Sequence, residues 1–60
     1  MKPSISDPTG ENIFSIVGKC STILKHAGQR DEAKKLGERV FASSSYDEAL
    51  SICQEYVDFT

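Results

Sequence analysis

The residues of this chain that could hold a metal or attack a substrate are two cysteines and one histidine. Cys20 and Cys53 each fall on the apolar side of a segment with helical periodicity, and His26 falls on the polar side of the first such segment. A zinc site needs further ligands, and neither a C-x-x-C nor an H-E-x-x-H motif occurs. A thiol on a core-facing side is neither exposed nor activated. We therefore predict two buried, structural cysteines, no metal site and no cofactor, and leave open whether the two thiols lie near each other.

The carboxylates are also explained without catalysis. Asp31, Glu32, Asp47 and Glu48 lie at the expected starts of helices, where the helix dipole and capping favour negative charge. A general acid or base needs a surrounding cleft, for which a core of this size has little room. The four glycines are scattered and form no phosphate-binding loop. The sequence therefore predicts that the protein is not an enzyme.

Three segments with helical spacing of apolar residues must position these side chains. They cover about residues 11–27, 30–42 and 46–58. Gly28 is suited to end the first, and Ser45 with Glu48 forms an S-x-x-E capping box that starts the third.

Residues 1–10, which contain both prolines, are expected to form a flexible arm. Short connections between three amphipathic helices predict an all-α, antiparallel three-helix bundle over residues 11–59. The expected core consists of Ile13, Ile16, Val17, Cys20, Leu24, Ala27, Ala33, Leu36, Val40, Leu50, Cys53, Tyr56 and Val57.

A chain of 60 residues buries little apolar surface, so its core is expected to need reinforcement. We predict that a homodimer supplies it. Gly37 lies in the interior of the second expected helix, where it is expected to let another helix approach closely beside Leu36. Some apolar residues sit at the edges of their helical stripes or, in the case of Phe59, just beyond the third helix, and are candidates for a contact surface with a partner. These are Phe14, Ile23, Phe41, Ile52 and Phe59.

Charge is unevenly spread along the chain. The formal net charge is −2, but most cations lie in the middle of the sequence, and residues 40–60 carry acids only. A candidate basic patch consists of Lys25, Arg30, Lys34, Lys35 and Arg39. The spacing of Gln29, Ala33 and Gly37 resembles the first helix and turn of helix-turn-helix DNA-binding domains, although Glu38 replaces the hydrophobic residue that follows in that family. A nucleic-acid-binding regulator is therefore an alternative, disfavoured by the negative net charge.

The segment MKPSISDPTG lacks the apolar core of a signal peptide, and no apolar stretch approaches the length of a membrane span. We therefore expect a cytoplasmic protein with reduced thiols and no membrane contact.

A further pattern spans residues 10–59 and consists of Gly10, Asn12, Phe14, Ala27, Gly28, Ser45 to Leu50, Tyr56 and Val57, with Glu11 inserted between the first two. In these residues the chain resembles short helical proteins, uncharacterised in function, that are encoded by bacteriophages and other mobile elements of Gram-positive bacteria. Some very short phage proteins inhibit host defence complexes by binding them. The resemblance therefore implies a protein-binding accessory factor, with a host or phage protein as partner and inhibition of a host defence or regulatory complex as a hypothesis. A small-ligand sponge at a dimer seam is a third possibility.

Overall fold

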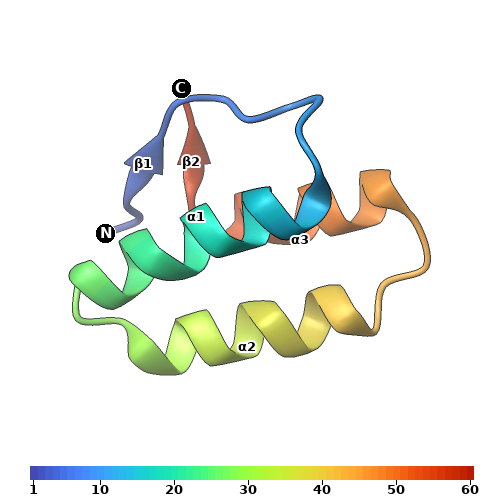
Figure 1. Ribbon diagram of the computed structural model, residues 1–60. Helices are drawn as coiled ribbons and strands as arrows, with labels where there is room; N and C mark the ends of the chain where they lie inside the picture. The colour runs from blue at the N-terminus through green and yellow to red at the C-terminus, as the bar shows by residue number, and fades with distance from the viewer.

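The computed structural model describes all of residues 1–60 and contains three helices and two short strands (Figure 1). The helices are α1 (Ile13–His26), α2 (Arg30–Phe41) and α3 (Tyr46–Tyr56), and the strands are β1 (Ser4–Ile5) and β2 (Asp58–Phe59). The predicted all-helical fold with three helices is confirmed, and all three helices lie close to where the periodicity placed them. The two strands were not predicted.

Local capping chemistry sets the ends of α1. The Asn12 side chain accepts a hydrogen bond of 2.8 Å from the Phe14 backbone N–H, so α1 begins two residues later than expected. At its C-terminal end, Gly28 adopts a φ of 76°, and the N–H of Gln29 donates to the Leu24 carbonyl at 2.8 Å. This left-handed glycine lets the chain reverse into α2, as its position in the sequence predicted.

The start of α3 differs in one detail from the predicted capping box. The Ser45 hydroxyl accepts from the Glu48 N–H at 3.0 Å, as expected. The Glu48 carboxylate, however, accepts from the backbone N–H and the hydroxyl of Ser44, at 3.0 and 2.9 Å, rather than from Ser45. These hydrogen bonds lower the pKa of Glu48.

The N-terminal segment is bound to the rest of the fold, which corrects the expectation of a separate flexible arm. β1 pairs in parallel with β2, and Ser4 and Ile5 lie opposite Asp58 and Phe59. The Asp58 N–H donates to Pro3 at 2.8 Å, and the Thr60 N–H donates to Ile5 at 2.9 Å. Because Val57 is already extended, α3 ends at Tyr56 instead of residue 58. The two ends of the chain therefore lie side by side over the helices (Figure 1).

The core is built mainly from one stripe of each helix. Its fully buried members include Ile16, Cys20, Leu24, Leu36, Cys53 and Val57, all of which were predicted. Three buried residues were not in the predicted core, Pro8, Ala49 and Ile52, whereas Ala27 after the end of α1 is exposed. Ile52 is 6% exposed and belongs to the same core cluster as Cys20 and Cys53.

Candidate functional site

An apolar groove of about 580 Å³ opens between α1, α2 and the start of α3. Helical spacing brings its residues together, because the groove follows the stripe next to the core stripe of α1 and of α2. No carboxylate, imidazole or thiol lines it. The lining residues are Ile13, Phe14, Val17, Gly18, Ser21, Gly37, Val40, Phe41, Ser43, Ser45, Tyr46 and Ala49.

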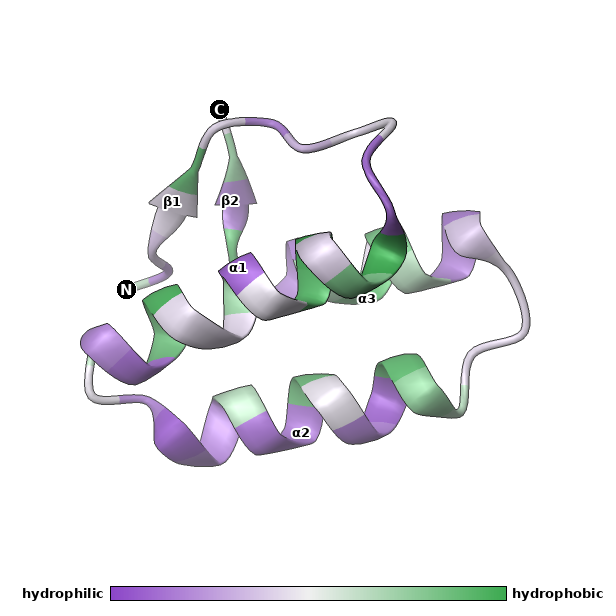
Figure 2. Cartoon of the chain, viewed as in Figure 1, coloured by the Kyte–Doolittle hydropathy of each residue, from purple (hydrophilic) through white to green (hydrophobic).

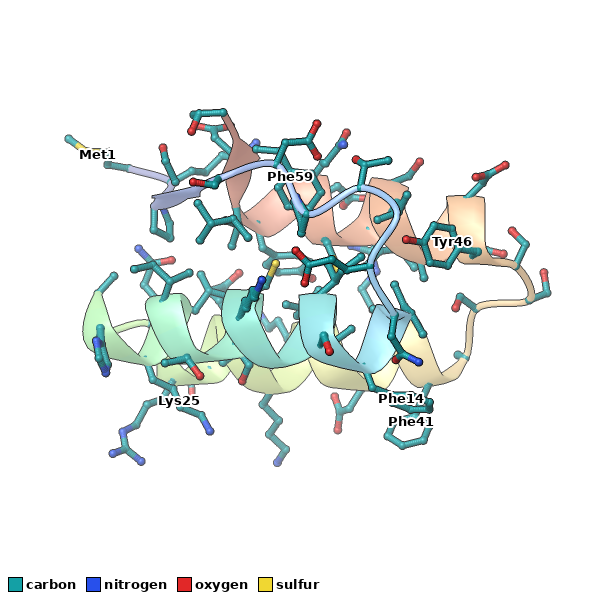
Figure 3. The ribbon with its side chains drawn as sticks, turned by 45° about the horizontal axis from the view of Figure 1, so that its top comes forward. Met1, Phe14, Lys25, Phe41, Tyr46 and Phe59 are labelled. Carbon is teal, nitrogen blue, oxygen red and sulfur yellow. The ribbon has the colours of Figure 1, made fainter.

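Two of the predicted contact residues meet at this groove. Phe14 comes from α1 and Phe41 from the last turn of α2, and their rings lie next to each other in Figure 3. Their exposed fractions are 76% and 88%, so both remain largely in contact with solvent. Figure 2 shows that α2 is mostly hydrophilic and becomes apolar toward this end. An exposed pair of phenylalanines is costly to leave in water, and such a patch is typical of a surface that binds a partner.

The other three predicted contact residues do not share this patch. Ile52 is only 6% exposed and lies in the core, so its assignment to the contact surface was wrong. Ile23 is half-buried and lines a second, shallower hollow together with Ile5 and His26. Phe59, in β2, is half-buried against the core.

Two glycines line the groove from facing helices. A Cβ atom added to Gly18 of α1 or to Gly37 of α2 would meet nothing within 4 Å. No helix of this chain approaches Gly37 closely, so the expected close approach of another helix beside Leu36 is not made within the chain and stays a prediction for a partner. Within this chain the two glycines only leave space open along the groove.

Tyr46 forms part of the groove and was not predicted as a site residue. Its hydroxyl donates to the Glu11 carbonyl at 2.6 Å and accepts from the Gly10 N–H at 3.2 Å. Tyr46 therefore ties the segment that precedes α1 to the start of α3. The only feature of the sequence that could have indicated this role is the position of Tyr46 directly after the capping residue Ser45.

The candidate basic patch is divided between two sides of the molecule. Arg39 contacts α3, where its Nη1 and Nη2 atoms donate to the Glu55 carboxylate at 2.6 and 3.0 Å. Its guanidinium carbon also lies 5.7 Å from the centre of the Tyr56 ring. Lys35 pairs with Glu32 at 3.4 Å. Lys25, Arg30 and Lys34 are exposed and take no part in any ion pair.

The two cysteines lie together in the core. Cys20 of α1 and Cys53 of α3 are both 0% exposed and belong to the same core cluster. The contact with Cys53 and the burial raise the pKa of the Cys20 thiol. A buried neutral thiol is a poor nucleophile. No group of three or more potential metal-ligating side chains occurs.

None of the three helices combines the length and the apolar character that a membrane crossing requires. No family model, curated protein or solved structure matches this chain.

Proposed function

We propose that this protein acts by binding another protein through the groove that Phe14 and Phe41 border, without catalysing a reaction. The observation that carries the proposal is the exposure of these two rings beside a groove whose middle is kept open by glycines. The groove lining contains no carboxylate, imidazole or thiol, and its one phenol, Tyr46, is hydrogen-bonded to the backbone of Gly10 and Glu11. Such a surface offers shape and apolar area, which are the properties that binding requires.

The narrower hypothesis, inhibition of a host defence or regulatory complex by a phage-type factor, is supported by the resemblance of residues 10–59 to short phage proteins. The homodimer stays a prediction, and if it forms through the two exposed phenylalanines it would occupy this groove. Partner binding and self-association would then exclude each other. A cytoplasmic location agrees with this role and stays a prediction.

The groove volume supports a second candidate function, the binding of a small apolar ligand. Small-molecule sites typically have volumes of about 300–1,000 Å³, and this groove has about 580 Å³. The rings of Phe14 and Phe41 would then cover the ligand. A nucleic-acid-binding regulator receives less support, because Lys35 and Arg39 are held by carboxylates on the other side of α2.

Site-specific photo-cross-linking tests the proposal. A benzophenone side chain replaces Phe14 or Phe41 in the full chain, which is expressed in the cells that naturally carry its gene. We expect adducts with a second protein, and we expect them to be lost when Gly37→Leu fills the groove. Glu38→Leu, which adds the same side chain at the neighbouring exposed position, is the matched control and should preserve them.

Three other results would point to a different binding surface, to a homodimer or to the absence of a protein partner. Adducts that survive Gly37→Leu would show that the groove is not the binding surface. An adduct of twice the mass of the protein would identify the homodimer. Absence of any protein adduct from either position would overturn the proposal, and a bound small molecule in the mass spectrum of the native protein would then favour the second candidate.

A further inference from the structure

The groove continues into a longer surface, because α1 and α2 carry matching stripes. Starting from Phe14 on α1 and from Phe41 on α2, each stripe advances in steps of four, three and four residues, so each follows one side of its helix. The stripes are Phe14, Gly18, Ser21 and Lys25 on α1, and Phe41, Gly37, Lys34 and Arg30 on α2. We call this surface the α1–α2 face. In Figure 3, Lys25 lies on the same side of the molecule as Phe14 and Phe41, at the opposite end.

The two ends of this face differ in chemistry. The aromatic end consists of the exposed Phe14 and Phe41. At the other end lie three cations that lack a carboxylate partner, Lys25, Arg30 and Lys34. The other four of the seven lysines and arginines, Lys2, Lys19, Lys35 and Arg39, all form ion pairs. The lysines and arginines that form no ion pair are therefore gathered at one end of the α1–α2 face.

We infer that the occupant of this face is an amphipathic helix of another protein, with apolar residues over the aromatic end and carboxylates over Lys25, Arg30 and Lys34. This inference rests on the proposed function and specifies its partner. Helices pack with their axes about 8–10 Å apart, and small residues permit the closest approach. Gly18 and Gly37 leave that space open at the middle of the face. The bound helix would complete a four-helix arrangement.

A second copy of this chain does not offer the same complementarity. Its own α1–α2 face presents the same cations and has no carboxylate in either stripe. The exposed apolar side chain of α3, Tyr46, already lines the groove and is tied to Glu11. The other exposed residues of α3 are acidic or polar, so no apolar row lies beside the acids. They are Asp47, Glu48, Ser51, Gln54 and Glu55. No helix surface of the chain therefore combines apolar and acidic residues in the order that this face requires.

A selection from a helical peptide library tests this inference on the full-length protein. The library displays peptides of roughly five turns, about the length of a helix in a globular protein or slightly more. Positions on one side are randomised among Leu, Phe, Ala, Ser, Gln, Glu and Lys. We expect selected peptides to place Leu or Phe at one end of that side and Glu at the other. The best peptide is then measured against two double variants.

The first variant, Lys25→Glu with Lys34→Glu, reverses the charge of the basic end. We expect it to weaken binding about tenfold, since exposed charge pairs contribute modestly and several act together. The control, Lys2→Glu with Lys35→Glu, changes the net charge equally but lies outside the face, and should change affinity less than about threefold. Higher salt should reduce the difference between the two variants.

Several outcomes would overturn the inference. One such outcome is that the selected peptides contain no more Glu than Lys, or that no peptide is selected at all. Another is equal affinity for the two charge variants. If apolar peptides without charge preference bind and Gly37→Leu blocks them, the proposed function stands and only the acidic-helix inference fails. Binding of duplex DNA or of phosphatidylserine vesicles that Lys25→Glu with Lys34→Glu abolishes would reassign the basic end, and a dimer in sedimentation would assign the face to a second copy.

Discussion

Gly18 of α1 and Gly37 of α2 line one groove from two helices, and neither has another part of the chain within 4 Å of the space where a Cβ atom would stand. Glycine in a helix interior lowers stability because the unfolded chain gains more backbone freedom. The fold itself therefore gains nothing from these two glycines. What they provide is an open surface between the helices.

Gly18→Ala and Gly37→Ala are each expected to increase the free energy of unfolding by about 0.5–1 kcal/mol. The added methyl group meets no atom, and the helix loses its most flexible residue. Urea denaturation of the single variants and of the double variant measures the effect. The same variants should bind a helical partner more weakly than the original protein, because the methyl groups enter the space that the partner would use.

Gly28→Ala is the control for the glycine prediction. Gly28 has a φ of 76°, a conformation that disfavours side chains, so alanine there should destabilise the protein by about 1 kcal/mol. A loss of stability for Gly18→Ala or Gly37→Ala of similar size would contradict the account of the groove.

The paired thiols of Cys20 and Cys53 predict a loss of stability at alkaline pH. Contact with Cys53 and burial raise the pKa of Cys20 in the folded state. In the unfolded chain a cysteine ionises with a pKa of about 8.5. The contribution of Cys20 to the free energy of unfolding is therefore complete below that pH and decreases as the pH rises above it, because its thiol ionises in the unfolded chain and stays neutral in the folded one. Thermal unfolding between neutral and alkaline pH should show this decrease, and Cys20→Ala should reduce the slope.

The same burial predicts slow reaction of both thiols with a disulfide reagent in the folded protein. Both should react rapidly after addition of denaturant. Fast reaction of either thiol under native conditions, with the protein still folded by circular dichroism, would show that the core opens more readily than the complete burial of Cys20 and Cys53 implies.

The contacts of Glu55 predict a loss of stability in acid. Hydrogen bonds from the Arg39 guanidinium lower the pKa of Glu55. The contribution of Glu55 to the free energy of unfolding is present above the pKa of a glutamate in the unfolded chain, about 4.3. It is lost as the pH falls through the lower pKa of the folded state. Melting curves between about pH 6 and 3 should show the decline. Glu55→Gln should make the curve flatter, whereas Glu38→Gln, at a position outside the four ion pairs, should leave its slope unchanged.

Tyr46→Phe removes one hydroxyl that makes two hydrogen bonds, to the backbone of Gly10 and Glu11. We expect a loss of about 1 kcal/mol in the free energy of unfolding, the usual size for such interactions. The amide of Gly10 should exchange with solvent faster, because Tyr46 is its only hydrogen-bond acceptor. Tyr56→Phe, whose hydroxyl contacts only the exposed Arg39, is the control and should not change that exchange rate.

The sequence by itself determined the three helices, the chain reversal at Gly28 and most of the core. These features depend on interactions between residues a few positions apart, such as the Ser45 cap and the spacing of Ile16, Cys20 and Leu24. Local periodicity fixes which side of a helix is apolar, so it carried this information without reference to the other helices.

Only the tertiary structure decided which apolar residues stay in water and which residues meet across the fold. Periodicity placed Phe14, Phe41 and Ile52 alike at the edges of their stripes, but the packing of the helices exposes the first two beside one groove and buries the third. The pairing of Ile5 with Phe59 and the contact of Cys20 with Cys53 join distant parts of the chain. No local signal encodes these contacts, because they arise from the way the elements pack in space.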